Sequence, residues 1–157
     1  MLTSLRILGR MPPEPDDAAD LALVDALASS AFVVMGVLTR IAAENDMSLT
    51  QLRALGILRD RRPRMAQLAE FLGLDRSTMS GLIERAEGRG LVQRVPNAED
   101  RRAVDVVMTA AGLELADVLA ADVRRALAPI TERIDPSRRA VLVEELTRML
   151  ALEEPPA

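Results

Sequence analysis

Apolar side chains recur every three to four residues along most of the chain, the spacing that places them on one face of an α-helix. Between residues 91 and 108 the pattern changes to alternation, which is typical of strands. The sequence therefore predicts a mainly α, α+β fold of six helices with a two-stranded hairpin. The predicted helices are Asp17 to about Glu44, one that begins after Ser48, 64–72, 76 to about 89, one after Thr109 and one after Asp135; the predicted strands are Leu91–Val95 and Ala103–Met108.

Residue types that begin and end helices lie at these boundaries. Ser48 and Gln51 have the spacing of a capping box, and Thr109 can cap the fifth helix. Gly73 and Gly90 are placed where a helix ends in a left-handed residue. The order of elements predicts a winged helix-turn-helix over residues 48–109.

The remaining segments predict an arm and a dimer interface. Residues 1–15 hold three prolines and are expected to form a flexible arm. The helices over 17–46 and 110–152 are more apolar than one domain of this length needs, so we expect them to pack on a second copy as a homodimer.

The fourth helix separates into two faces. Met79, Leu82, Ile83 and Ala86 are predicted to point inward. Small hydroxylated and basic residues at the start of a helix suit contact with DNA phosphates and base edges, although an ordinary solvated face has the same composition. The predicted DNA-facing residues are Arg76, Ser77, Thr78, Ser80, Gly81 and Arg85.

Two arginines lie in the loop between the strands. Arg101 and Arg102 suit insertion into a minor groove or contact with phosphates, and Asp100 is expected to orient one of them through a salt bridge. A plain charged turn is the alternative. Arg94 and Gln67 are second-line predictions for phosphate contact.

The charge of the chain is unevenly distributed. The net charge of the whole chain is −4. Residues 53–102 hold eleven Arg against seven acids, whereas the rest holds nine Arg against seventeen acids. The basic excess therefore coincides with the predicted winged segment, as expected for a protein that binds duplex DNA. Ordinary fluctuation of charge along a soluble chain is the alternative.

The absence of Cys and His excludes several kinds of chemistry. Without these residues there is no disulfide, Cys/His metal site or imidazole-dependent catalytic dyad. No phosphate loop, nucleophile elbow or dinucleotide fingerprint is present. We therefore expect neither an enzyme nor a bound cofactor or metal. The opening residues are too short and weakly apolar for a signal peptide, and we expect that no run approaches a membrane span. The sequence therefore predicts a cytoplasmic protein with no membrane partner.

Residues 64–112 resemble the MarR family of winged-helix transcription regulators. The resemblance rests on LAEFLGLDRSTMSGLIERAEGRGLVQR, on PNAEDRRAVDVVMT with Asp100-Arg101-Arg102, and on Ala111-Gly112. It extends more coarsely from about residue 17 to 152. The resemblance implies that Ser77, Thr78, Ser80 and Arg85 face the major groove. It also implies a minor-groove contact by Arg101, with Arg102 beside it and Asp100 as a support.

The same resemblance implies a function. A homodimer would bind a palindromic operator in double-stranded DNA as a sequence-specific regulator, usually a repressor, and a small phenolic or lipophilic effector would release it. Gly81 departs from the larger residue common in the family, which together with the acidic flanks leaves one alternative: a winged-helix dimer that binds proteins or ligands without DNA.

The resemblance also implies where an effector would bind. The crevice would lie between the dimer helices and the DNA-binding lobe, although residues of this kind more often belong to the ordinary core. The predicted lining residues are Phe32, Met35, Leu55, Leu58 and Leu113, with Arg40 or Arg53 to pair with an anionic ligand.

Overall fold

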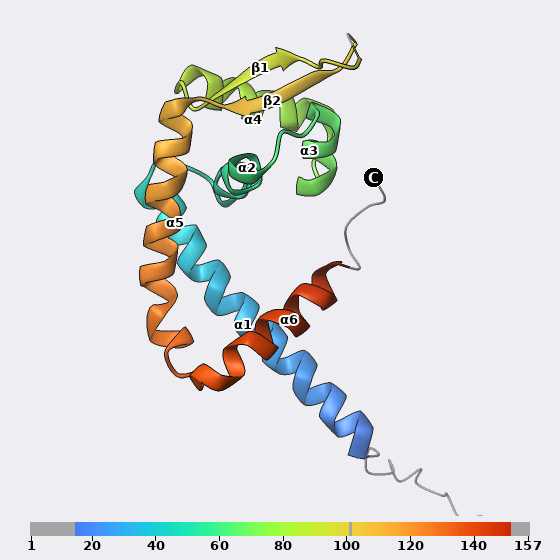
Figure 1. The fold of residues 1–157 in the computed structure, drawn as a ribbon, viewed down its shortest axis with the longest axis vertical. Coiled ribbons are helices and arrows are strands. Elements are labelled where there is room, and N and C mark those ends of the chain that lie inside the picture. The colour runs from blue at the N-terminus through green and yellow to red at the C-terminus, as the bar shows by residue number, and fades with distance from the viewer. Residues whose placement is uncertain (1–14, 101, 152–157) are drawn as a thin grey trace, which may run out of the picture. The chain divides into compact units, whose positions relative to one another are not determined.

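The computed structural model describes residues 15–100 and 102–151. Within them it has six helices and a two-stranded antiparallel sheet in the predicted order (Figure 1). The elements are α1 (Pro15–Glu44), α2 (Leu49–Asp60), α3 (Met65–Leu72), α4 (Arg76–Gly88), β1 (Val92–Pro96), β2 (Val104–Met108), α5 (Ala110–Thr131) and α6 (Pro136–Ala151).

The predicted helix boundaries are confirmed to within two residues. The Ser48 hydroxyl accepts a hydrogen bond from Gln51 N, and the Gln51 side chain accepts one from Ser48 N. Gly73 ends α3 with φ 66°. α1 begins at Pro15, two residues earlier than predicted, because proline fits the first turn of a helix. The predicted arm otherwise lies outside the described residues.

The chain divides into two units after Gly36. The part of α1 in the first unit has apolar side chains on every face, and several of them are exposed: Leu21, Leu23, Val24, Phe32, Val33 and Met35. A helix that is apolar all round normally needs a cover.

The composition of α1 corrects one expectation. Residues Asp17–Glu44 contain a stretch of mean hydropathy 2.1, which is long and apolar enough to cross a membrane. The expectation that no run approaches such a span was therefore wrong. None of this stretch is buried inside the chain. Core helices of soluble proteins satisfy the same criterion, so length and composition do not by themselves identify a membrane span.

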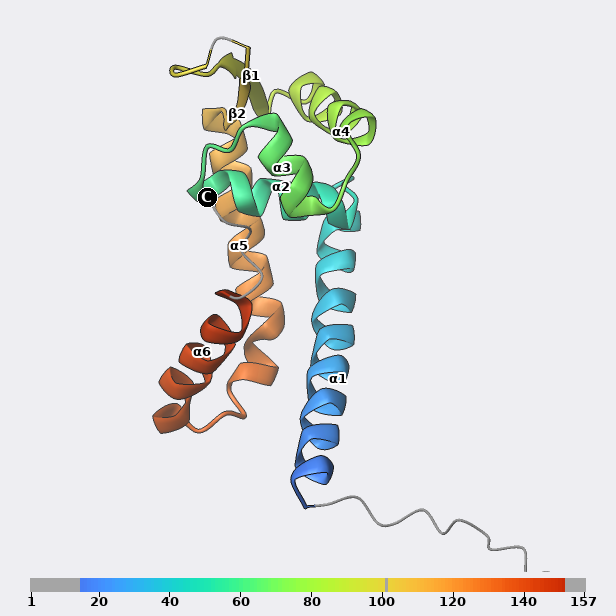
Figure 2. The same ribbon diagram turned by 90° about the vertical axis from the view of Figure 1, so that its right-hand side faces the viewer.

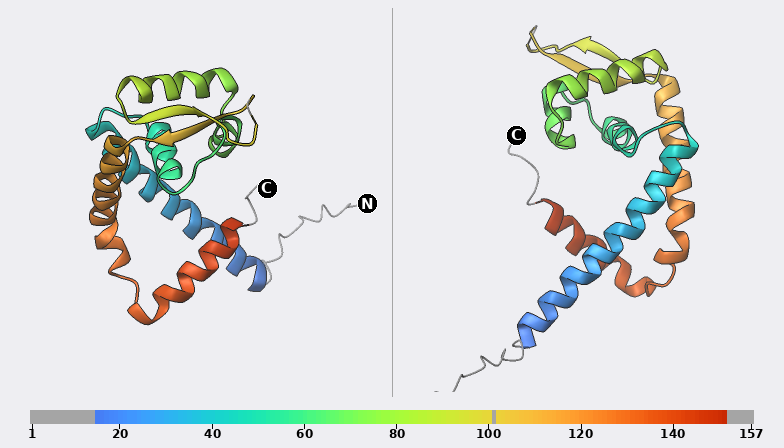
Figure 3. Two further views of the ribbon diagram at one scale, coloured as in Figure 1. Left: turned by 45° about the horizontal axis from the view of Figure 1, so that its top comes forward. Right: turned by 180° about the vertical axis from the view of Figure 1, so that it is seen from behind.

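The second unit contains the hydrophobic core. Leu68, Met79, Ile83 and Val106 are completely or almost completely buried where α3, α4 and β2 meet α2. Figures 1 and 2 show α4 and the hairpin at the same end of this unit, with α2 and α3 beneath them. In the left view of Figure 3, α4 lies along the strands. The core thus holds the predicted recognition helix and the wing on one surface.

The wing is a two-stranded hairpin, and the residues just before α3 bind to its outer edge. Val92 pairs with Met108 and Pro96 with Val104 in the hairpin. The opposite edge of β2 is occupied as well, because Val106 N donates to Pro63 O at 3.1 Å and Arg64 bridges Asp105. The residues before α3 are therefore joined directly to the wing.

Gly112 marks a close approach between α5 and the segment that joins α4 to β1. A Cβ at this position would lie 2.0 Å from Leu91 O. The Thr109 hydroxyl accepts from Gly112 N and donates to Gly90 O, which draws the two segments together. Only glycine fits here without a backbone shift.

α6 leaves its apolar residues uncovered by the rest of its unit. The exposed members are Val141, Leu142, Val143, Leu146, Met149 and Leu150. A stripe of this size on a soluble protein normally marks an interaction surface.

Candidate nucleic-acid interface

The first turn of α4 is organised by Asp75. Its carboxylate accepts hydrogen bonds from Ser77 N and Thr78 N, both at 2.9 Å. The hydroxyls of Ser77 and Thr78 also donate to it, at 2.6 and 2.5 Å. These bonds hold the pKa of Asp75 well below its usual value, and the bond from the Ser77 hydroxyl has the largest effect.

This arrangement changes what the two hydroxyls can offer to DNA. An ionised carboxylate has no proton, so Ser77 and Thr78 must supply the proton in each bond. While those bonds persist, both hydroxyls present only lone pairs outward. In this conformation the two hydroxyls therefore have no proton to donate to a phosphate.

The rest of the outward face of α4 agrees with the sequence prediction. Met79, Leu82, Ile83 and Ala86 are buried. Arg76, Ser77, Thr78, Ser80 and Arg85 are exposed, whereas Gly81 is half-buried. Arg85 lies over Gly81, since a Cβ at that glycine would be 3.5 Å from Arg85 Nη1. As DNA contacts, these residues stay predictions.

A groove separates the wing from α3 and the start of α4. Its volume is about 690 Å³. Four arginines line it, against a single acid, Glu70, among the described lining residues. The lining residues are Arg64, Met65, Ala66, Ala69, Glu70, Leu74, Arg76, Met79, Ser80, Arg94, Arg102, Ala103 and Val104. A concave surface lined by guanidinium groups suits the phosphates of a nucleic acid.

One of these arginines is bound within the protein. Arg94 Nη1 donates to Glu87 Oε2 at 2.6 Å, Arg94 Nη2 donates to Ser80 O at 3.1 Å, and Arg94 N donates to Glu87 Oε1 at 2.9 Å. Arg94, which was predicted to contact a phosphate, therefore connects β1 to α4 in this structure.

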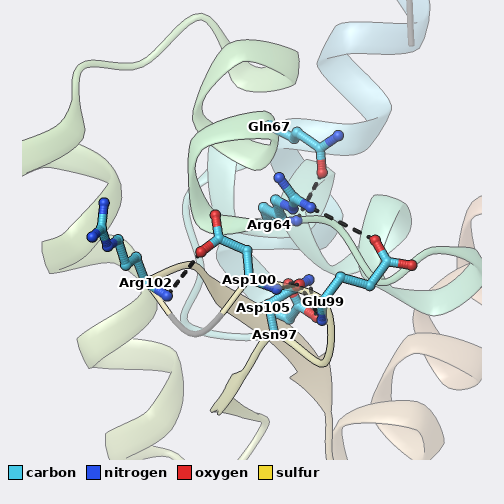
Figure 4. A network of polar contacts seen from close by, with 7 residues as sticks. All are labelled: Arg64, Gln67, Asn97, Glu99, Asp100, Arg102 and Asp105. Atoms are coloured by element: carbon cyan, nitrogen blue, oxygen red, sulfur yellow. Dashed lines mark hydrogen bonds and ion pairs between the residues drawn. The ribbon is translucent and has the colours of Figure 1, made fainter.

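The wing turn is held by side-chain hydrogen bonds (Figure 4). Asn97 Oδ1 accepts from the backbone N of Glu99 and Asp100, and Asn97 Nδ2 donates to both carboxylate oxygens of Asp105. Asp100 Oδ1 accepts from Arg102 N at 3.0 Å.

The contact between Asp100 and Arg102 differs from the expected salt bridge. Asp100 orients the turn through the backbone of Arg102, because the distances place its carboxylate on the amide N–H. Within the described part of the chain it makes no ion pair with an arginine. The Arg102 side chain is exposed. Arg101 lies outside the described residues.

Gln67 supports α3. Its Oε1 accepts from Arg64 N at 2.9 Å, so its carbonyl oxygen is occupied at the start of the helix (Figure 4). Arg64 Nη2 lies 3.9 Å from Glu99 Oε2 in the wing turn. The sequence predicted no individual role for Arg64, Glu87 or Asn97. Asparagine at the start of a turn was the one local signal available for these three residues.

A second hollow is apolar with a basic rim. It has a volume of about 360 Å³ and lies between α2, α5 and the end of α1 that begins at Val37. The lining residues are Leu38, Leu52, Arg53, Leu55, Gly56, Arg59, Ala116, Leu119, Ala120, Val123 and Arg124. Arg59 is bound to Asp60 at 2.8 and 3.0 Å, whereas Arg53 and Arg124 form no ion pair with any described residue.

The predicted effector residues are only partly brought together. Arg53 and Leu55 line this hollow. Leu58 and Leu113 line a different, polar depression beside it, and Arg40 lies 3.9 Å from Glu44 on the helix surface. Phe32 and Met35 belong to the first unit. No local pattern in the sequence pointed to Arg124, because its place in the hollow depends on how α5 packs against α2.

The described residues contain no cluster of three or more His, Cys, Asp or Glu that could hold a metal ion.

Comparison with known proteins agrees with this geometry. A family model described as MarR family matches residues 45–103, from the end of α1 into the wing. The HTH-type transcriptional repressor NicR of Pseudomonas putida is 29% identical over 114 residues, 72% of each chain. A further relative, from Rhodopseudomonas palustris, is named as a transcriptional activatory protein; it is 32% identical over 96 residues, 61% of this chain and 46% of that one.

Solved structures share the fold. RV1404 from Mycobacterium tuberculosis has a TM-score of 0.69 and 27% identity, covering 93% of this chain and 99% of that one. NadR, solved in complex with 4-hydroxyphenylacetate, has a TM-score of 0.69 and 24% identity, covering 92% of this chain and 100% of that one.

The fold and the arginine-lined surface thus define a winged helix-turn-helix protein of six helices and a two-stranded wing. Within that class, residues 45–103 are similar to the MarR family, and the relative NicR is named as an HTH-type transcriptional repressor.

Proposed function

We propose that this protein is a sequence-specific repressor that binds a palindromic operator as a homodimer and is released by a small organic anion. The observation that carries the proposal is the groove with four arginines between the wing and the recognition helix α4. Phosphate contacts from this groove would set the register of the protein on DNA, and the outward face of α4 would read base edges.

The dimer is supported by the uncovered apolar side chains of α6 and, separately, by those of α1. Each of these apolar faces is stabilised when it is buried against another apolar surface. A second copy of the chain supplies the same surface by two-fold symmetry. Such a dimer would place two recognition helices in major grooves about 34 Å apart. A soluble regulator of this kind would act in the cytoplasm.

The effector site is supported by the apolar hollow between α2 and α5. Arg53 and Arg124, which form no ion pair with any described residue, suit a carboxylate or phenolate, and the apolar walls suit an aromatic ring. The 4-hydroxyphenylacetate bound by NadR has this chemistry. A ligand here would release DNA only if it bound better to a dimer spacing that does not fit DNA.

Gly81, which together with the acidic flanks supported the alternative without DNA binding, is compatible with a DNA contact. The missing side chain lets the guanidinium of Arg85 lie across the surface of α4. Arg85, in the last turn of α4, can then reach a base edge or a phosphate across this surface.

The proposal is tested by footprinting on the DNA around the gene and by a reporter under the same promoter. We expect two symmetric half-sites about one helical turn apart, and higher reporter expression when the protein is deleted. A single asymmetric site would contradict the dimer arrangement, and lower expression after deletion would contradict repression.

A further inference from the structure

Arg94 differs from the other arginines of the groove because its charge is matched. Its contact with Glu87 is a short, charge-assisted pair in which both carboxylate oxygens accept hydrogen bonds, one of them from the Arg94 backbone. The two side chains are 33% and 28% exposed, so water screens this pair less than it screens a surface pair. Bonds of this kind are roughly twice as strong as neutral ones.

The remaining groove arginines are available to DNA. Arg64 has its nearest described carboxylate, Glu99, only at 3.9 Å. Arg76 and Arg102 form no ion pair with any residue in the described ranges. Of the four guanidinium groups, the one at Arg94 is thus directed into the protein, toward Glu87 and Ser80 O.

The same contacts join the two DNA-facing elements. Ser80 lies on the outward face of α4 and Glu87 in its last turn, while Arg94 is in the middle of β1. One side chain therefore contacts two residues of α4 that are seven positions apart in the sequence. This contact limits rotation of the wing relative to the recognition helix.

We propose that Glu87 is a specificity-determining positioning residue, which holds Arg94 away from DNA phosphates and fixes the wing to α4. The inference rests on the proposed function, since it concerns how that surface distinguishes an operator from other DNA. Phosphate contacts are sequence-independent, so an additional cation raises affinity for every duplex alike. A wing fixed to α4 favours the one DNA geometry that fits both elements at once.

The test measures fluorescence anisotropy on a short duplex of random sequence between about 50 and 200 mM salt, the range over which phosphate contacts weaken most visibly. The proteins are the wild type, Glu87→Gln, Arg94→Gln, the double variant, and Glu84→Gln as a matched control. Glu84 is exposed on the same helix and loses the same charge. Unfolding in urea is measured for each protein to separate effects on folding.

Freeing one cation should steepen the slope of log K against log salt for Glu87→Gln by about 0.9. Over this fourfold salt range the variant's affinity should fall about threefold further than that of the wild type. The double variant and Glu84→Gln should have the wild-type slope. On an operator fragment, Glu87→Gln should have a lower ratio of specific to random binding.

Two results would overturn the inference. Equal slopes for Glu87→Gln and Glu84→Gln would show that Arg94 is not held back. A shallower slope for Arg94→Gln alone would show that Arg94 already contacts phosphate. Failure of the proposed function is a separate result: the wild type would then bind no genomic sequence better than random duplex, while the slopes would still test Glu87.

Discussion

Asp75 accepts four hydrogen bonds at the start of α4, two from backbone N–H groups and two from hydroxyls. The backbone bonds satisfy donors that the helix itself leaves unpaired. The hydroxyl bonds fix the side chains of Ser77 and Thr78 before any DNA is bound. One carboxylate therefore both caps the helix and orders two side chains of the proposed DNA-binding face.

Removal of the Asp75 carboxylate should destabilise the fold by an amount that depends on pH. We expect Asp75→Ala to lower the urea midpoint of unfolding at neutral pH, because the variant lacks the capping bonds. The pKa of Asp75 is lowered in the folded state, so its contribution is present above the unfolded value of about 4 and is lost as pH falls below it. The difference in urea midpoint between the wild type and Asp75→Ala should therefore become smaller at acidic pH.

Asp75→Asn is the matched control for this prediction, since asparagine caps helices about as well and does not titrate. It should stay close to the wild type at neutral pH. A gap between wild type and Asp75→Ala that is constant from neutral pH to about pH 2 would contradict the linkage.

Gly112 gives a second prediction at the residue scale. Gly112→Ala should reduce the free energy of unfolding by about 1–3 kcal/mol, because the new Cβ meets Leu91 O and the backbone must shift. Gly56→Ala, in α2, is the control: nothing lies within 4 Å of its Cβ position, so it should stabilise by about 0.5–1 kcal/mol. Urea unfolding of both variants measures the difference, and equal effects would contradict the close approach.

Among the elements, α2 and α5 form the proposed effector site. Arg53→Gln should weaken binding of 4-hydroxyphenylacetate about tenfold or more, the effect of removing one charge-assisted hydrogen bond. Arg40→Gln is the matched control, because Arg40 lies outside the hollow and pairs with Glu44. Isothermal titration calorimetry measures both. Equal weakening in the two variants, or no binding by the wild type, would contradict this assignment of the site.

The starts of the helices and the buried face of α4 could be predicted from the sequence. Helix starts at Ser48, Thr109 and Asp135 were predictable because a cap acts on backbone groups two or three residues away. The inward face of α4 followed from spacing alone. The contacts of Arg94 with Glu87 and of Asn97 with Asp105 could not be predicted from the sequence. They depend on how β1 packs against α4 and on how the two strands of the wing pair.

For the whole molecule, the uncovered face of α6 predicts the oligomeric state. Leu142→Glu/Leu146→Glu should convert a dimer of 17.1 kDa chains into monomers, because four-residue spacing places both charges on one face. Arg148→Glu changes the net charge by the same amount on the charged face beside Glu144 and should leave the dimer intact. Light scattering after size exclusion measures the mass. A double variant that stays dimeric would place the interface elsewhere.

The central claim is that the wing and α4 bind DNA through arginine. Fluorescence anisotropy with DNA from upstream of the gene, over a salt series, tests it most directly when the wild type is compared with Arg101→Ala/Arg102→Ala. We expect tight wild-type binding with a steep salt dependence, and for the variant weaker binding with a slope shallower by about 0.9 for each phosphate that it no longer neutralises. Identical slopes and affinities, or wild-type binding no stronger than to random duplex, would contradict the claim.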